Sequence, residues 1–252
     1  MITRFLDKIF LKLKSFTFLK IKSVRGKKVK IKINSGIELW RSRAYEKKEP
    51  ETLDWIDNFK KGEIFYDVGA NIGVYSLYAS KKKCKVYAFE PASNNYSSLL
   101  KNIEINKLNI NSYGIGLSNK ERISVLNLVS TTEGDSQHNL NKSQKIYSRK
   151  FKIGQGTFIT SLDNLIYKYN FPIPTHIKID VDGHEKEILL GAKKILKSKK
   201  LKSVMVEINF KNHNEYTFIL NIMKKSNFYI KNRSKRVYTN KLIKAQNIYF
   251  FK

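Results

Sequence analysis

The chain contains only one cysteine, four prolines and two tryptophans among its 252 residues. Because Cys84 is the single thiol, the sequence excludes a framework of intramolecular disulfides and a zinc site built from cysteines. No long hydrophobic run occurs near the amino terminus, where lysines interrupt the apolar residues every few positions. Neither a signal peptide nor a membrane-spanning helix is therefore expected, and the predicted location is the cytoplasm.

Acidic residues are also scarce: 21 aspartates and glutamates stand against 49 lysines and arginines, which gives a formal net charge of +28. A field of this sign attracts anionic partners such as RNA, acidic glycans or anionic lipids. Lysine, asparagine and isoleucine are all abundant, however, as in proteins encoded by AT-rich genomes, so part of the charge is expected on solvated faces without a specific role. The charge alone does not identify a partner.

Residues 1–50 are predicted to form an amino-terminal extension. Apolar residues recur at helical spacing over residues 2–18 with lysines between them, which predicts a basic amphipathic helix. Residues 29–33 then alternate between apolar residues and lysine, as in a strand. The apolar stripe of the helix either packs against the rest of the chain, which we favour, or makes a peripheral contact with the anionic inner face of a membrane.

The most informative segment follows this extension. A short apolar run ends at Asp67, a turn containing Gly69 and Gly73 comes next, and a helix-like segment leads to a second apolar run that ends at Glu90. This order is typical of a nucleotide-binding strand–helix–strand unit. The glycines allow the backbone to turn sharply and to approach a ligand closely. Glu90, at the tip of the second strand, can accept two hydrogen bonds from the hydroxyls of a ribose.

The details of the turn favour S-adenosylmethionine over a nicotinamide dinucleotide. A pyrophosphate group prefers three glycines at the start of a helix, whereas this turn has two glycines and the carboxylate of Asp67, which repels phosphate. A carboxylate suits the ammonium and sulfonium groups of S-adenosylmethionine better. A tight turn without any ligand is the less favoured alternative. The predicted cofactor-binding residues are Asp67, Gly69 and Asn71 at the methionine end, Gly73 in the turn, Glu90 at the ribose, and Ile115 and Gly116 near the adenine.

A second group of ionisable residues lies near the ends of two later apolar runs. The first run ends at Asp180 and is followed by Asp182 and His184, and the second ends at Glu207. Open α/β sheets bind ligands at the carboxyl ends of their strands, so these side chains are expected at one edge. Asp180 is the first candidate for a general base, with His184 as the alternative.

An all-oxygen metal site is a further possibility at this edge. Asp180, Asp182 and Glu207 would then bind Mg²⁺ or another divalent ion, which lowers the pKa of a hydroxyl bound to it. The competing interpretation is structural, because an aspartate at the position of Asp182 also suits the start of a helix.

The predicted elements alternate between strands and helices, and two strands close the chain. This pattern predicts an α/β fold with a doubly wound, mostly parallel sheet. The polar residues 117–160 are predicted to form a lid or hairpin beside the pocket. The other predicted elements are helices at 94–107, 185–196 and 216–225, and strands at 110–117, 176–179, 204–208, 228–231 and 247–251.

Several of these segments together resemble the FkbM family of S-adenosylmethionine-dependent methyltransferases. The resemblance covers residues 60–210 and rests mainly on Tyr-Asp-Val-Gly-Ala-Asn from residue 66, Phe-Glu-Pro from residue 89 and Lys-Ile-Asp-Val-Asp-Gly-His-Glu from residue 178. Family members commonly have glutamate where this chain has Asp182.

The resemblance implies a Rossmann-like class I methyltransferase domain over residues 51–252, with an antiparallel strand near the carboxyl terminus. It also implies O-methylation of a hydroxyl on a sugar, a glycan or a secondary metabolite. The extension and the lid are not specified by the family and are expected to choose the acceptor.

Two other functions stay open. Ribose 2′-O-methylation of RNA would explain the charge and would need a catalytic lysine beside Asp180, and Lys178 shares the side of Asp180 unless the strand breaks. Methylation of base amines is disfavoured because the Pro-Pro sequence of its usual motif is missing. A non-catalytic protein that uses a degenerate methyltransferase fold to bind a membrane or a partner is the third interpretation. The intact pair of Asp67 and Glu90 argues against it.

Overall fold

The computed structural model describes residues 18–140, 150–235, 237–239 and 244–252. The predicted amphipathic helix at residues 2–18 lies outside these ranges apart from Phe18, which begins the first strand. Its proposed contact with a membrane therefore stays a prediction. Within the described residues, no helix combines the length and apolar character needed to cross a bilayer.

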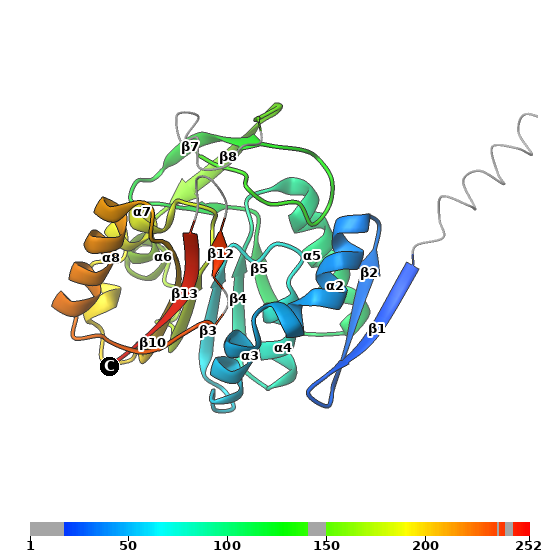
Figure 1. Ribbon diagram of the computed structural model, residues 1–252, viewed down its shortest axis with the longest axis horizontal. Helices are drawn as coiled ribbons and strands as arrows, with labels where there is room; N and C mark the ends of the chain where they lie inside the picture. Colours follow the sequence, from blue (N-terminus) through cyan, green and yellow to red (C-terminus); the bar gives the residue numbers. More distant parts are fainter. Residues whose placement is uncertain (1–17, 141–149, 236, 240–243) are drawn as a thin grey trace, which may run out of the picture.

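A central sheet organises the molecule (Figure 1). Five strands run parallel to their neighbours: β3 (Ile64–Val68), β4 (Lys85–Phe89), β5 (Ile110–Tyr113), β9 (His176–Ile179) and β10 (Ser203–Asn209). Three more pair antiparallel at the other edge: β13 (Lys244–Phe251), β11 (Tyr229–Arg233) and β12 (Tyr238–Thr239). The spatial order is β11-β13-β10-β9-β3-β4-β5.

The chain moves from β3 to one side of the sheet through β4 and β5, and later returns to place β9 on the other side of β3. The carboxyl ends of β3 and β9 thus flank the point where the winding reverses, which is where open α/β sheets bind ligands. The doubly wound fold with an antiparallel strand near its end is confirmed.

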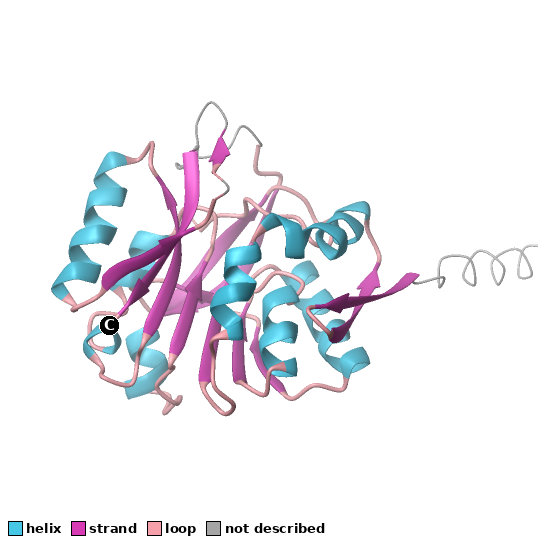
Figure 2. Ribbon diagram, turned by 60° about the horizontal axis from the view of Figure 1, so that its bottom comes forward, coloured by secondary structure: helices cyan, strands magenta, loops and turns pink. Residues whose placement is uncertain are grey.

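Helices cover both faces of this sheet (Figure 2). Alternate residues of a strand contribute to two separate hydrophobic cores, because successive side chains of a strand point to opposite faces of the sheet. Phe65 belongs to one core and Tyr66 to the other. The first core includes residues of α3 (Pro50–Asp57), α4 (Val74–Lys81) and α5 (Ser93–Asn106). The second includes residues of α6 (Leu162–Tyr167), α7 (Glu185–Leu190), the 3₁₀ turn η1 (Ile195–Lys197) and α8 (His213–Lys225).

The amino-terminal extension is joined closely to the sheet domain. The strands β1 (Phe18–Val24) and β2 (Lys27–Ile33) form a hairpin, and the backbone amides of Lys30 and Lys32 donate to the side chains of Asn106 and Asn102 on α5. The helix α2 (Gly36–Lys48) follows. Neither α2 nor α3 was predicted. In α2 the charged residues occur on all sides, so the helix shows no apolar stripe in the sequence.

Two predicted boundaries were wrong. The strand expected at 110–117 is divided, because Gly114 and Ile115 separate β5 from β6 (Gly116–Leu117), which belongs to another sheet. The helix expected at 185–196 ends at Leu190, and the backbone continues through a turn into η1.

A second, three-stranded sheet lies at the carboxyl end of the main strands. It contains β6, β7 (Arg122–Leu128) and β8 (Ile153–Thr160), and β7 and β8 pair antiparallel as a hairpin. This hairpin occupies much of the segment predicted to be a lid.

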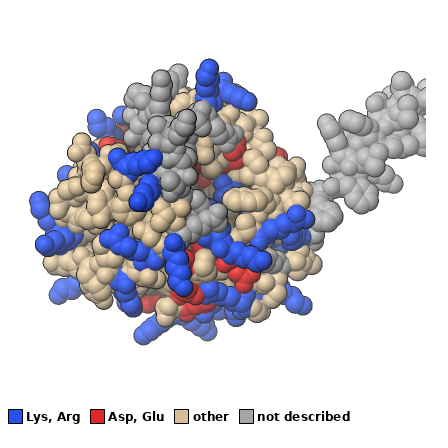
Figure 3. All heavy atoms as spheres, viewed as in Figure 1, with Lys and Arg blue, Asp and Glu red and all other residues tan. Residues whose placement is uncertain are grey.

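Lysine and arginine side chains are spread over many elements of the face in Figure 3. On this face they do not form one continuous patch.

Candidate active site

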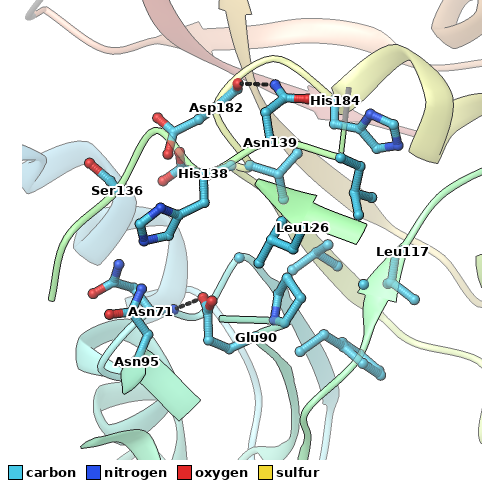
Figure 4. Close-up of a pocket in the computed structure, with 18 of the residues that line it drawn as sticks. Asn71, Glu90, Asn95, Leu117, Leu126, Ser136, His138, Asn139, Asp182 and His184 are labelled. Atoms are coloured by element: carbon cyan, nitrogen blue, oxygen red, sulfur yellow. Dashed lines mark hydrogen bonds between the residues drawn. The ribbon is translucent and has the colours of Figure 1, made fainter. Parts of the chain in front are cut away.

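A pocket of about 640 Å³, part of which is open to solvent, lies where β3 and β9 end (Figure 4). The lining comes from the turns after β3, β4 and β9, from β6 and β7, and from the loop 129–140. The lining residues are Val68, Gly69, Asn71, Phe89, Glu90, Pro91, Asn95, Ile115, Gly116, Leu117, Leu126, Asp135, Ser136, His138, Asn139, Leu140, Asp180, Val181, Asp182 and His184.

The glycine turn brings two strand ends into contact. Gly69 has a φ of +80°, and a Cβ atom there would lie 2.0 Å from the carbonyl oxygen of Asp180. Only glycine fits this position, since the added carbon would overlap backbone that cannot move aside. Gly73 serves packing instead: a Cβ atom there would lie 2.4 Å from Cδ1 of Leu99, and Gly73 does not line the pocket.

Glu90 is a buried carboxylate at the pocket wall. Its two oxygens accept hydrogen bonds from the backbone amides of Asn71 at 2.8 Å and Ala92 at 2.9 Å, which fix its orientation. Burial raises the pKa of Glu90 to about 7, although these amides favour the charged form. The two amides do not offset the cost of burying the charged carboxylate. A ligand that donates further hydrogen bonds to it, as a ribose diol does, would stabilise the charged form.

Asp67 is buried near the end of β3. Its carboxylate accepts a hydrogen bond from the hydroxyl of Ser76 at 2.6 Å and lies 3.5 Å from the ammonium of Lys178. Asp67 and Lys178 are partners in the register of β3 and β9, so their side chains leave the sheet on the same face. Asp67 does not line the pocket.

Asp180 lies at the pocket and forms an ion pair with the same lysine, at 3.0 Å. Burial favours the neutral carboxyl, but the ammonium of Lys178 outweighs it and lowers the pKa of Asp180. For Lys178, burial favours the neutral amine, and the carboxylates of Asp180 and Asp67 reverse this effect and raise its pKa. The pair is therefore ionised at neutral pH.

Asp182 and His184 also lie in the lining, on the loop between β9 and α7. Asp182 has a φ of +58°, and its carboxylate accepts a hydrogen bond from the backbone amide of Gln137 at 2.7 Å. Its carbonyl accepts from the side chain of Asn139 at 3.3 Å, as Figure 4 shows. His184 shares a hydrogen bond of 3.0 Å with Ser118, and burial lowers its pKa to about 4, with Arg122 adding to the effect. The imidazole is therefore neutral at neutral pH.

Glu207 does not line the pocket, although the carboxylates of Asp180 and Asp182 act on it. Burial and these neighbouring charges raise the pKa of Glu207 well above its usual value. Across the described residues, no group of three or more histidines, cysteines, aspartates and glutamates is arranged to hold a metal ion. The predicted site of Asp180, Asp182 and Glu207 therefore gains no support from the structure.

The loop 129–140 supplies lining residues that the sequence did not identify, including Ser136, His138 and Asn139. Its backbone is held by the side-chain amides of Asn71 and Asn95, which both donate to the carbonyl of Asp135, at 2.9 and 3.0 Å. The polar character of the loop was visible in the sequence. Which of its residues face inward depends on partners in distant turns, and no local pattern encodes that choice.

A family model, the methyltransferase FkbM domain, matches residues 67–230. The hexuronic acid methyltransferase AglP of Haloferax volcanii is 28% identical to this chain over 214 residues, which cover 82% of each protein. The crystal structure of an FkbM methyltransferase from Methylobacillus flagellatus KT superimposes with a TM-score of 0.51 at 16% identity. This match covers 77% of the present chain and 44% of that one, so the present chain spans less than half of that protein.

The magnesium protoporphyrin IX methyltransferase ChlM of Synechocystis PCC 6803, solved with bound SAM, also gives a TM-score of 0.51. Its identity is 9%, and the match covers 86% of this chain and 84% of that chain. The two structures show a shared fold. The family match begins at Asp67, near the end of β3, and includes the glycine turn, Glu90 and Asp180. The resemblance noted in the sequence is confirmed, and the chain belongs to the FkbM family of methyltransferases.

Proposed function

We propose that this methyltransferase transfers the methyl group of S-adenosylmethionine to a hydroxyl of a sugar or glycan. The main supporting observation is the buried Glu90 carboxylate at the pocket wall, beside the turn where Gly69 lets the ends of β3 and β9 approach closely. The acceptor class is supported by AglP, whose name gives a hexuronic acid as its substrate.

The residues present fit this cofactor. Glu90 would accept hydrogen bonds from the ribose hydroxyls, and Ile115 and Gly116 would border the adenine. Gly69 and Asn71 would lie at the methionine end. When bound, the cofactor supplies an electrophilic methyl group on a sulfonium.

The contribution of the protein is to hold and desolvate the acceptor and to take up its proton. Asp180 is our candidate for the group that accepts the hydrogen bond of the acceptor hydroxyl, because Lys178 keeps its carboxylate ionised at the pocket. A fixed acceptor orients the hydroxyl oxygen for an in-line displacement. The hydroxyl proton then passes to Asp180 as the new bond forms. Asp182 would act indirectly, because its carboxylate accepts a hydrogen bond from the backbone amide of Gln137 and so positions the loop 129–140.

Ribose 2′-O-methylation is disfavoured. Lys178 lies beside Asp180, as that hypothesis requires, but a lysine acts as a base only after it has lost its proton. The two flanking carboxylates raise the pKa of Lys178, so the ammonium is retained.

Calorimetric titration tests the cofactor assignment. Wild-type protein should bind S-adenosylmethionine and S-adenosylhomocysteine but not NAD. Glu90→Ala should weaken binding by roughly 1.5–3 kcal/mol, the usual contribution of hydrogen bonds to a charged group. Glu104→Ala is the matched control, because Glu104 is exposed on α5 and should leave affinity unchanged. Equal affinities for wild type and Glu90→Ala would rule out this role for Glu90.

The acceptor assignment is tested by incubating methyl-labelled cofactor with a panel of neutral and uronic sugars and isolating the labelled product. An ether at a hydroxyl resists mild alkali, whereas a methyl ester of a carboxylate is hydrolysed. Alkali-stable label in a sugar would support the proposal. Alkali-labile label, or label in RNA alone, would contradict it.

A further inference from the structure

A second pocket, of about 430 Å³ with its open part, adjoins the first and shares Gly69, Asn71 and Asp180 with it. Its outer wall is the helix α2, which contributes Trp40, Arg41, Ala44 and Lys48. The helix lies outside the residues that match the family model. What this wall binds therefore has to be inferred from its own chemistry.

Arg41 differs from the other cations of this pocket. Lys48 forms an ion pair of 2.9 Å with Glu49, and Lys178 is paired with Asp180 and Asp67. Within the part of the chain that the structure describes, no carboxylate lies at ion-pair distance from Arg41. Its Nε donates to the carbonyl of Gly134 in the loop 129–140. This bond holds the guanidinium in place and leaves its two terminal nitrogens for another partner.

The guanidinium is close enough to both pockets to influence their acids. It helps to lower the pKa of Asp180 and acts in the same direction on Glu90. Arg41 thus lies near the shared wall where the glycine turn meets Asp180. According to the proposed function, the methionine part of the cofactor occupies that region.

We propose that Arg41 binds the α-carboxylate of the methionine part of the cofactor. This proposal depends on the proposed function, because it assumes that S-adenosylmethionine is the cofactor. A guanidinium presents a planar pair of donors that matches a carboxylate. Lys48 and Lys178 balance the two carboxylates of the same pocket, Glu49 and Asp180, so among the described lining residues Arg41 is the cation left over for an incoming carboxylate.

Two ligands that differ in the amino-acid tail provide the test. S-Adenosylhomocysteine has the carboxylate, whereas 5′-methylthioadenosine keeps the adenosine and the sulfur and lacks the tail. In calorimetric titrations, Arg41→Gln should lower the affinity for S-adenosylhomocysteine about 10- to 100-fold, as expected for loss of a charge-assisted hydrogen bond. It should change the affinity for 5′-methylthioadenosine by less than about twofold.

Arg43→Gln is the matched control, since Arg43 belongs to the same helix and lines neither pocket. It removes the same charge and should leave both affinities unchanged. Arg41→Lys keeps the charge but lacks the planar pair of donors. Its affinity for S-adenosylhomocysteine should lie between those of wild type and Arg41→Gln. Arg41→Lys is also the variant to use if Arg41→Gln does not fold, as judged by circular dichroism.

Unchanged binding of S-adenosylhomocysteine by folded Arg41→Gln would overturn the proposal. So would an equal loss for both ligands. If the variant weakened only the binding of glucuronate to the protein saturated with S-adenosylhomocysteine, the guanidinium would belong to the acceptor, and the proposal would again be wrong. Failure of wild type to bind S-adenosylhomocysteine at all would instead reject the proposed function.

Discussion

The two ends of the β9 strand carry buried polar groups of opposite character. At its amino end, His176 lies in a closed network with Ser203 and Glu63. Near its carboxyl end, Lys178 and Asp180 border the pocket. Both ends bury ionisable groups, but only the carboxyl end lies where open α/β sheets bind ligands.

The network at the amino end satisfies its members fully. The indole N–H of Trp55 can only donate, so the hydroxyl of Ser203 accepts from it at 2.8 Å and donates to Nδ1 of His176 at 2.7 Å. Nε2 of His176 then donates to Glu63 at 2.9 Å, and Lys202 completes the set at 2.6 Å from the same carboxylate. A serine, a histidine and an acid in this order also occur in hydrolases, but Ser203 is fully buried and cannot reach a substrate.

At the carboxyl ends of the nearby strands β4 and β10, two buried carboxylates are less well stabilised in their charged form. Burial raises the pKa of Glu90 to about 7 and that of Glu207 well above its usual value. Buried acids with raised pKa values are concentrated at functional sites, where a ligand or a reaction uses them. In a structural network, the charged groups are instead expected to be paired. Buried acids with raised pKa values therefore indicate the functional edge of this sheet better than the density of polar residues does.

The largest expected effect is on catalysis at the carboxyl end. Asp180→Asn should lower the rate of methyl transfer about 10²–10⁴-fold, because an amide cannot take up the hydroxyl proton. Binding of S-adenosylhomocysteine should be retained, which calorimetry checks. Ser203→Ala, at the other end of the strands, should keep its turnover at temperatures where it is folded. If Asp180→Asn kept near wild-type turnover, Asp180 would not be the general base, and the role would pass to His184 or Asp182.

Addition of EDTA to the same assay examines the metal hypothesis. Turnover that EDTA leaves unchanged would rule out the predicted site of Asp180, Asp182 and Glu207. A loss of activity that Mg²⁺ restores would support an acidic metal site that forms only with substrate.

The sequence predicted the sheet well because its signals are local. The run from His176 to Ile179 alternates polar residues with isoleucine between Pro174 and Asp180, and its predicted limits agree with β9. The same holds for the turn at Gly69, where a φ of +80° favours glycine.

The wall formed by α2 could not be predicted in this way. Its residues carry charge on every side of the helix, so no amphipathic pattern was visible. Arg41 gains its position from a bond to Gly134, far along the chain, and Asp67 lies beside Lys178 of another strand. These choices follow from tertiary contacts rather than from local sequence.

At the amino end of the strands, the expected effect is on stability. Ser203→Ala removes the partner of both Trp55 and His176, and each buried group left unpaired costs about 1–3 kcal/mol. The free energy of unfolding should fall by about 2–4 kcal/mol in urea denaturation, without loss of cofactor affinity. Ser23→Ala is the control, because Ser23 is exposed on β1. A weaker affinity in Ser203→Ala with unchanged stability would reverse the roles assigned to the two ends.

The smallest expected effect is a pH dependence that separates the two ends. The folded pKa of Glu90, about 7, lies above the value of 4.5 expected in the unfolded chain, so folding favours its protonated form. Its burial cost is present above pH 7, declines as the pH falls, and is gone below pH 4.5. Glu63 has the opposite sign: Lys202 and His176 outweigh burial and lower its pKa to about 2. Its stabilisation is full above pH 4.5 and is lost as the pH falls toward 2.

The difference in unfolding free energy between wild type and Glu90→Gln isolates the first of these contributions. Buried His176, whose pKa burial lowers, also contributes in this pH range, but it is present in both proteins and cancels. Between pH 7 and pH 6, wild type should gain about 1 kcal/mol relative to the variant. The gain should disappear with saturating S-adenosylhomocysteine, because hydrogen bonds from the ribose would keep Glu90 ionised. A difference that is constant from pH 5 to pH 8 would show that Glu90 is compensated like the network at the other end of the strands.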